Sequence, residues 1–455
     1  MTFELTLTGA QHELVRRAHT FAEDVIRPVS AKYDKLEECP WDIVDEAAGQ
    51  GFYNALFYAD LIADPTGLSL PLFLEEIFWG CAGIGLTIVL PALALSSLNQ
   101  AGTPDQIAQW APEMFGTPGD IKLAALAVSE PQGGSDVAHL QTRAVRDGDD
   151  WVLDGTKIWI GNGGIADVTI VNAVVDPDLG TKGQALFVVP KNTPGMTQVR
   201  KLTKLGHRAS HTAELAFEGC RIPGENLLGG VDKLEHKLAK AREGGETRSG
   251  ALGTFEQTRP MVAAMALGVA RAAFEYACQY AAEREAFGGP IIDNQGVAFP
   301  LADIGADIDA ARLLCWRASW MAASGVPFRM SEGSMSKLKA SEVAVRATEQ
   351  AVQVLGGWGY VDDHPVEKWY RDAKLYTIFE GTSEIQRMVI GRTLPGATAE
   401  GPLHHHLPGD HDGLSRRFGH GSLARARAGE VFLKMAEKAP GALLELGGRL
   451  ASPGR

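Results

Sequence analysis

The sequence predicts a multidomain α+β chain: an N-terminal α-helical domain, a central antiparallel β-barrel or sandwich domain, and a C-terminal four-helix bundle. Three observations indicate this order. Apolar residues recur at helical spacing in roughly the first 120 residues and again after residue 253, and short β-rich segments lie between. We expect domains over 1–120, 121–237 and 238–395, followed by a Gly-, Pro- and His-rich linker and short helix over 396–455.

The N-terminal region carries an apolar stripe that indicates an amphipathic helix. Thr8 is the expected N-cap, and Pro28 is expected to end this helix. A charge-free stretch over 77–104 is long enough to span a bilayer. It contains Pro91 and several polar residues, so we expect a helix buried in protein and no membrane span. Further helices are predicted over 41–49, 71–80, 84–98 and 104–115.

From about Lys122 the pattern becomes strand-like. Asp147-Gly148 and Asp154-Gly155 are dipeptides typical of hairpin turns. Strands with no intervening helices favour antiparallel pairing. After residue 253, long helical segments with short loops predict a bundle. These helices are expected over 258–285, 295–323, 335–355, 366–376 and 383–393.

Charge and cysteine content restrict the class of protein. The chain of 455 residues has 56 acidic and 43 basic residues, for a formal net charge of −13. This argues against nucleic acid or an anionic membrane as the main partner. The 5 cysteines include no C-x-x-C pair, which favours neither a disulfide framework nor a zinc site. Together with an N-terminus lacking a signal-peptide pattern, this predicts a cytoplasmic protein.

Three motif-like stretches favour structural interpretations. The segment 161–166 fits G-x-G-x-x-A, but a strand follows it where a dinucleotide site needs a helix, so a turn is favoured over a dinucleotide site. The S-x-x-K stretch over 336–339 is expected to be a solvated first helix turn. The histidines His404, His405, His406 and His411 are expected to lie in a linker, and we predict no metal site.

Two segments indicate chemistry. The stretch Ala127–Asp136 follows a strand, and its proline and paired glycines predict a loop with exposed backbone N–H groups. Such a loop suits a phosphate or the polar edge of a heteroaromatic ring, and Trp159 on the following strand offers an aromatic face. The second segment places Glu380 after two apolar residues and ahead of a helix cap. Apolar surroundings raise the pKa of a carboxyl group, as a general base requires; the alternative is a structural acid paired with an arginine.

The chain resembles the acyl-CoA dehydrogenase family over roughly residues 8–394. SEPQGGSD is similar to that family's flavin-binding loop, and DGTKIWIGNGG to the strand that follows. TFEQTRPMVAA, EREAFGGPI, QVLGGWGY, EKWYRDAK and IFEGTSEIQR resemble further family segments in the same order. The resemblance implies the three-domain fold above, with FAD between the β domain and the bundle.

By position, the resemblance implies cofactor contacts in two groups. Contacts within the subunit are expected from Leu126, Val128, Ser129, Ser135, Trp159, Gly161, Thr382 and Glu384. Contacts across a subunit interface are expected from Arg284, Phe287, Gln295, Gln353 and Gly357. A homodimer or homotetramer is therefore implied.

The resemblance also implies a reaction. Glu380 matches the base that removes the α-proton of an acyl-CoA while the β-hydride passes to flavin, giving a trans-2-enoyl-CoA. Ser135, Glu256, Arg259 and Gly381 match substrate-contacting positions, and electron-transfer flavoprotein is the implied acceptor. One branch takes its base from the position of Thr258, and nearby Glu256 keeps that alternative open.

Departures from the family pattern leave other functions open. Gly161 stands where Thr or Ser is usual, which suggests an oxygen-using acyl-CoA oxidase or flavin monooxygenase as an alternative. A low-turnover binding or assembly protein on the same fold is a third possibility. The acyl chain is not specified, although Gly85, Leu86, Ile88 and Val89 are expected to line its cavity.

Overall fold

The N-terminal part of the chain is helical, as expected. The structure, a computed structural model, describes residues 6–245 and 250–399; the side chains of 250–257 and 395–399 are excluded from that description. Helix α3 coincides with the predicted range, whereas α4 was not predicted. The helices are α1 (Gly9–Phe21), α2 (Ser30–Leu36), α3 (Trp41–Gly49), α4 (Ala55–Ala63), α5 (Ser69–Gly80), α6 (Ala82–Ala101) and α7 (Pro104–Glu113).

The first helix begins as predicted and ends differently. Thr8 caps α1, because its hydroxyl accepts a hydrogen bond from the Gln11 N–H at 3.2 Å. The prediction that Pro28 ends the helical segment was wrong. A π turn over Ala22–Ile26 and a 3₁₀ turn over Arg27–Val29 carry the chain directly into α2. Proline is tolerated there because the first turn of a helix leaves backbone N–H groups unpaired in any case.

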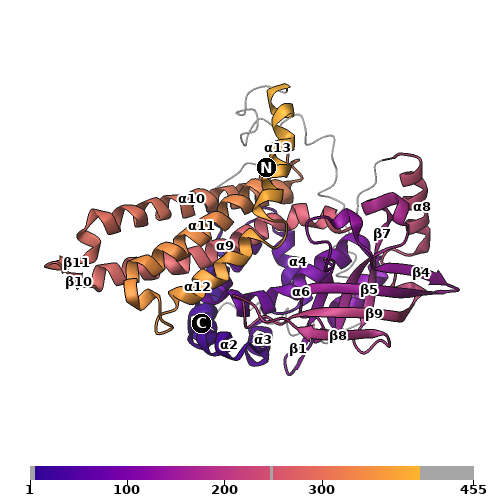
Figure 1. Ribbon diagram of the computed structural model, residues 1–455, viewed down its shortest axis with the longest axis horizontal. Helices are drawn as coiled ribbons and strands as arrows, with labels where there is room; N and C mark the ends of the chain where they lie inside the picture. The colour runs from indigo at the N-terminus through magenta and orange to yellow at the C-terminus, as the bar shows by residue number, and fades with distance from the viewer. Residues whose placement is uncertain (1–5, 246–249, 400–455) are drawn as a thin grey trace.

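Helix α6 lies in the middle of the molecule, beside the β sheet (Figure 1). It packs against α5, the long helix α9 (Gly250–Glu283) and strand β3 (Ala124–Ala127). It and the Thr258–Glu283 part of α9 are long and apolar enough to cross a membrane, but 67% and 61% of their most apolar windows are buried inside the fold. Their apolar character is therefore accounted for by packing against protein.

The central region is a seven-stranded sheet in the order β3-β6-β4-β5-β9-β8, with β7 pairing with β6. Most pairs are antiparallel, as predicted, but β3 and β4 run parallel to β6, so the sheet is mixed. Turn 162–166 connects β5 to β6, as expected, and no helix follows it. The strands are β3 (Ala124–Ala127), β4 (Arg143–Asp147), β5 (Asp150–Gly161), β6 (Val168–Val174), β7 (Gln184–Pro190), β8 (Met196–Lys201) and β9 (Thr212–Pro223).

Only one of the two predicted hairpin turns forms. Asp147 pairs with Asp150 across the turn that joins β4 to β5. Asp154-Gly155 instead lies inside β5, at a bulge where the pairing with β9 changes register. The Asp154 carboxylate accepts a hydrogen bond from the Gly219 N–H of β9 at 2.6 Å. The dipeptide therefore bends a continuous strand and does not reverse the chain.

The C-terminal helices form the predicted bundle. Helix α9 packs against α10, α11 and the N-terminal helix α5. The bundle extends away from the β sheet and ends at the small hairpin β10–β11 (Figure 1). Helix α8 (Val231–Arg242) joins the two parts, and the bundle helices are α9 (Gly250–Glu283), α10 (Gln295–Ser324), α11 (Glu332–Leu355), α12 (Val366–Ala373) and α13 (Ser383–Ala399).

A buried polar cluster fastens the bundle to the β domain. Asp372 on α12 accepts a hydrogen bond from the His207 backbone N–H at 2.5 Å and pairs with Lys368 at 2.6 Å. Burial lowers the pKa of His207 to about 4, so its ring is neutral at pH 7. The cluster fixes the end of α12, from which the chain continues to Glu380.

Candidate active site

A loop after β3 exposes two hydroxyl side chains. Ser129 is partly exposed and Ser135 is exposed, and neither hydroxyl makes a hydrogen bond with another described residue. The backbone of this loop is folded on itself, since Glu130 and Gly133 exchange N–H···O bonds at 3.0 Å in both directions. The loop therefore presents unused polar groups from a fixed backbone.

A buried ion pair holds this loop from below. Lys157 on β5 donates to the Glu130 carboxylate and to the Val128 carbonyl, both at 2.8 Å, and both charged side chains are fully buried. Glu130 also accepts from the backbone N–H groups of Gln141 and Thr142. Burial lowers the pKa of Lys157 to about 8. Burial would raise the pKa of Glu130, but Lys157 and these N–H groups lower it overall, so both groups are charged at pH 7.

Trp159 stands beside the loop with its indole in the open. Its side chain is 56% exposed and its φ is +60°, at an irregularity of pairing between β5 and β9. A bulky residue with positive φ is uncommon and typical of functional sites. Val128 is buried and Leu126 partly buried in the same region. An open aromatic face next to unused hydroxyls suits a planar ligand with polar edges.

A side chain at Gly161, at the end of β5, would require the Leu90 side chain to move. A Cβ atom built there would lie 2.7 Å from the Cδ1 atom and 3.0 Å from the Cδ2 atom of Leu90 on α6. Leu90 therefore occupies the volume that a Thr or Ser at 161 would use. Leu86 and Leu90, one helical turn apart, are both partly exposed, whereas Gly85, Ile88 and Val89 are buried. Of the predicted cavity residues, only Leu86 thus has exposed surface.

The second loop carries Glu380 in a left-handed conformation. Glu380 has φ +53° and Gly381 has φ +87°. Gln386 on α13 donates its side-chain amide to the carbonyls of both residues, at 3.1 and 2.9 Å. A Cβ atom at position 381 would lie 2.7 Å from the Gln386 amide nitrogen, so only glycine fits. Thr382 caps α13 through its hydroxyl, which accepts from the Ile385 N–H at 3.3 Å.

The carboxylate of Glu380 faces α9 and α11. The Thr258 hydroxyl donates to Glu380 Oε2 at 3.3 Å, and the Lys337 and Arg259 charges act on it. Burial raises the pKa of Glu380 above its ordinary value, while these three groups oppose the rise. No ion pair within the described range joins Glu380 to an arginine, and Arg259 donates to Ser334 at 2.9 Å. A positioned carboxyl group of raised pKa has the properties of a general base.

Sequence reasoning missed Lys337. The stretch 336–339 was expected to be a solvated first helix turn, and this was wrong, because Ser336 and Lys337 are both fully buried. Lys337 lies on the second turn of α11 and donates to the Gly381 carbonyl at 2.8 Å. The apolar neighbours of α11 bury this turn, and no local pattern in the sequence signals that.

A pocket of about 260 Å³ lies beside the Glu380 loop. It is lined in part by Thr382, Glu384 and Arg387. Glu384 is exposed, and hydrogen bonds at the start of α13 lower its pKa. The predicted residue Glu256 lies on α9, but its side chain is outside the described residues, as are His404, His405, His406 and His411. Position 258 carries no carboxyl group, and Glu256, which kept the alternative base open, has its side chain outside the described residues.

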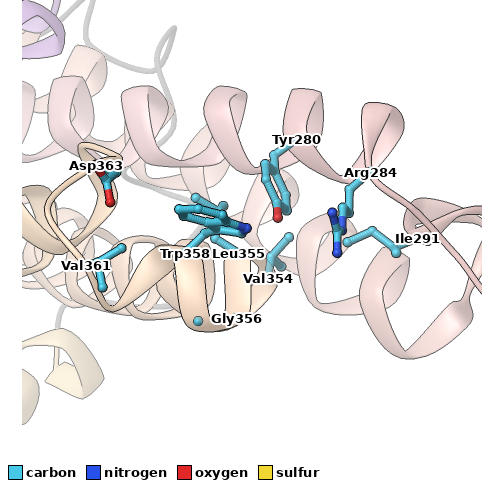
Figure 2. A pocket seen from close by; sticks show the side chains of 10 residues that line it. Tyr280, Arg284, Ile291, Val354, Leu355, Gly356, Trp358, Val361 and Asp363 are labelled. Atoms are coloured by element: carbon cyan, nitrogen blue, oxygen red, sulfur yellow. The ribbon is translucent and has the colours of Figure 1, made fainter.

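The remaining predicted residues gather at the opposite end of the bundle from the β domain, next to β10 (Glu285–Ala286) and β11 (Gly289–Pro290) (Figure 1). Arg284 and Gly357 line a pocket of about 640 Å³ there. Figure 2 shows Tyr280 of α9 and Arg284, just after that helix, facing Leu355 and Trp358 across this pocket. Phe287 is fully exposed, and Gln295 and Gln353 are also exposed but do not line the pocket. This group is separate from the Glu380 site within one chain.

Three sequence models of one family match the chain in order. They are the N-terminal domain over residues 8–117, the middle domain over 125–220 and the C-terminal domain over 249–394 of acyl-CoA dehydrogenase. The chain belongs to the acyl-CoA dehydrogenase family. Members of this family are FAD-dependent oxidoreductases that dehydrogenate acyl-CoA to enoyl-CoA, and this is the class of reaction assigned to the chain.

Relatives and solved structures support this membership. The chain is 41% identical over 386 residues to the mitochondrial short-chain specific acyl-CoA dehydrogenase of Rattus norvegicus, covering 83% of this chain and 89% of the relative. It is 34% identical to the solved butyryl-CoA dehydrogenase of Megasphaera elsdenii, with a TM-score of 0.77, over 86% of this chain and all of that one. A prolyl acyl carrier protein oxidase shares the acyl-CoA dehydrogenase fold at 27% identity and a TM-score of 0.74, covering 86% of this chain and 100% of that one.

The loop after β3 fits the family's cofactor. FAD has a planar ring system with polar edges, and this acyl-CoA dehydrogenase offers an open indole face at Trp159 beside the unused hydroxyls of Ser129 and Ser135. The fixed backbone of the loop satisfies the requirement for preorganised polar contacts.

Proposed function

We propose that this chain is a short-chain acyl-CoA dehydrogenase in which Glu380 is the catalytic base. The observation that carries the proposal is the placement of the Glu380 carboxyl group, whose pKa burial raises, on a loop held by Gln386 and Lys337. In the carboxylate form, Glu380 removes the α-proton of a bound acyl-CoA thioester. FAD, when bound, accepts the hydride from the β-carbon.

The thioester carbonyl needs a hydrogen-bond donor, because negative charge develops on its oxygen as the α-proton leaves. The backbone N–H of Glu380 makes no hydrogen bond to any other described residue. We assign it to the carbonyl oxygen. Base and donor then belong to the same residue, so the loop that positions one also positions the other.

Other predicted residues take binding roles in this proposal. Val128, Ser129, Ser135 and Trp159 hold the flavin ring system, with Leu126 and Gly161 beside it, while Thr382 and Glu384 contact the cofactor near α13. Ser135, Arg259 and Gly381 contact the substrate, and Glu256 is assigned there by position in the sequence alone.

The role of Glu380 is tested by proton exchange. An acyl-CoA with sulfur in place of its β-carbon has no β-hydride to transfer, so exchange of its α-protons with D₂O reports the base alone. We expect Glu380→Gln to lose exchange by about a thousandfold. Glu349→Gln, which changes an exposed carboxylate on α11 to which no role is assigned, is the matched control and should exchange at the wild-type rate. Equal exchange in both variants would remove Glu380 from the mechanism.

The short acyl chain is supported by the names of the relatives and by Leu90. Packed on Gly161, Leu90 restricts the space between α6 and β5. A series of straight-chain acyl-CoAs should reduce the flavin fastest at about four carbons, and Leu90→Ala should move the optimum to longer chains. An unchanged optimum in Leu90→Ala would place the specificity elsewhere.

Electron-transfer flavoprotein is the proposed acceptor. The alternative is reaction with oxygen, which Gly161 favours because the hydroxyl usual at this position is missing. Leu90 fills the vacated volume with apolar atoms, which argues against extra space for oxygen beside the ring. Oxygen uptake during turnover decides between them: we expect little uptake and rapid reduction of added electron-transfer flavoprotein.

A homo-oligomer and a cytoplasmic location complete the proposal. The pocket of Arg284 and Gly357 shares no lining residue with the pocket beside the Glu380 loop of the same chain, as expected if it binds the cofactor of a second subunit. The proposal is a homotetramer or homodimer, to be measured by light scattering. All 5 cysteines are free, which fits a reducing compartment. We propose no membrane span and no nucleic-acid partner.

A further inference from the structure

Lys337 is a buried cation, and no carboxylate of the residues that the structure describes lies within hydrogen-bonding distance of it. Its side chain is fully buried, and among the described residues its ammonium group bonds only to the Gly381 carbonyl, at 2.8 Å. An ammonium group has three protons to donate, and its burial is costly unless it is paired. Because its burial lowers the stability of the fold, we expect the Lys337 ammonium group to have a functional role.

The ammonium group acts on the loop of the base in two ways. Mechanically, the Lys337 ammonium group and the Gln386 amide both donate to the Gly381 carbonyl. Hydrogen bonds from two helices, α11 and α13, therefore hold the same peptide group. Glu380 and Gly381 both have positive φ, and strained backbone of this kind persists only where surrounding contacts fix it. Electrostatically, the charge lies near the Glu380 carboxylate and counteracts the effect of burial on it.

We propose that Lys337 is a positioning residue of the active site: its ammonium group holds the peptide that follows Glu380, and its charge keeps Glu380 in the carboxylate form that accepts the α-proton. This rests on the proposed role of Glu380. Lys337 itself does not touch the substrate in this proposal.

The charges around Glu380 set the expected pH dependence. Thr258 and Arg259 face it from α9 and Lys337 from α11, while Glu384 on α13 acts on Lys337. Burial lowers the pKa of Lys337 to about 8. Below that pH the lysine is charged and favours the carboxylate; above it the lysine is neutral, and the base is ionised without its help.

Two substitutions separate the mechanical and electrostatic effects. Lys337→Met removes both the hydrogen bond and the charge, whereas Lys337→Gln retains a donor for the Gly381 carbonyl and removes only the charge. Lys339→Met is the matched control, because Lys339 lies on the same helix but pairs with Asp307 away from the loop. All are measured as FAD-loaded protein.

The first readout is α-proton exchange of the β-sulfur acyl-CoA against pH. Near pH 6 we expect both Lys337 variants to exchange about tenfold more slowly than wild type, with the curves converging above about pH 8. The second readout is amide hydrogen exchange of residues 380–386, which should increase in Lys337→Met and stay at the wild-type level in Lys337→Gln. Lys339→Met should match wild type in both.

Three results would overturn the inference. The first is a pH profile of α-proton exchange in Lys337→Gln that superimposes on that of wild type. The second is a rate of α-proton exchange that falls by the same factor at every pH. The third is amide hydrogen exchange of residues 380–386 that is unchanged in Lys337→Met. Failure of the base assignment is recognised separately, since Glu380→Gln would then still exchange. With Glu380→Gln inactive, a wild-type profile in Lys337→Gln contradicts the Lys337 inference alone.

Discussion

The two loops of the proposed active site each rest on a buried lysine, and the two lysines differ in their partners. Lys157, under the loop after β3, pairs with the Glu130 carboxylate at 2.8 Å. Lys337, under the Glu380 loop, bonds only to a carbonyl among the described residues. Burial lowers the pKa of each to about 8. Each site contains a lysine with no exposed surface, and the two sites differ in the group that this lysine contacts.

The difference separates a structural role from a functional one. The Lys157–Glu130 pair neutralises its own charge, so it leaves little field at the cofactor loop and serves to fix the backbone. Among the described residues Lys337 has no carboxylate at hydrogen-bonding distance, and its charge acts on the Glu380 carboxylate. A buried unpaired charge costs stability, and such costs are typical of residues retained for function.

Removing Lys157 should have the largest effect on stability. Lys157→Met leaves the Glu130 carboxylate buried without its partner, and we expect a loss of about 3–5 kcal/mol at pH 7 together with weaker retention of FAD. Adding Glu130→Gln should recover more than half of the loss. Thermal melting of the single and double variants measures this, and a single variant as stable as wild type would show that the pair is not a clamp.

Removing Lys337 should have a smaller effect of opposite sign. Because the pKa of Lys337 is lowered from 10.5 to about 8, its burial costs stability below pH 8, and the free energy of unfolding of wild type should rise between about pH 8 and 10.5. Lys337→Met lacks this cost, so we expect it to be more stable at pH 7 by about 2 kcal/mol. The two proteins should converge near pH 10, as followed by denaturant unfolding at a series of pH values. A destabilised Lys337→Met would show that the hydrogen bond to the Gly381 carbonyl outweighs the cost of the buried charge.

The smallest effect is expected at Gly161, between the two loops. Gly161→Thr places a side chain against the flexible end of the partly exposed Leu90, which can move aside, and we expect a loss of about 1 kcal/mol. The double variant Leu90→Ala and Gly161→Thr should recover most of the lost stability, because the smaller side chain at position 90 leaves room for the threonine at position 161. Additive losses in the double variant, measured by the same melts, would show that Leu90 is not what excludes a side chain at 161.

The sequence predicted those features that depend on local chemistry. The loop over 127–136 was recognised from its proline and glycines, and Glu380 from its apolar neighbours and the helix cap that follows. The three-part order of the fold followed from periodicity alone. Where local signals were ambiguous, tertiary pairing decided: Asp154-Gly155 is a turn dipeptide, yet β9 pairs along it on both sides and keeps the strand continuous.

Features that depend on distant residues could not be predicted in this way. Ser336 and Lys337 read as a solvated helix start, because nothing within the motif indicates that α9 and α13 cover it. The proximity of Leu90 to Gly161 joins residues of two domains, and the grouping of Arg284 with Gly357 joins the segments that directly follow α9 and α11. Pro28 was wrongly predicted to end the helical segment, because a π turn followed by a 3₁₀ turn accommodates the proline and continues the chain into α2.

The central claim is that Glu380 initiates the dehydrogenation of a short acyl-CoA. The direct measurement is anaerobic mixing of the FAD-loaded protein with butyryl-CoA, followed by flavin absorbance. Wild type and the control Glu349→Gln should bleach within the mixing experiment, and Glu380→Gln should bleach at least about a thousandfold more slowly. Bleaching of Glu380→Gln at the wild-type rate would contradict the account.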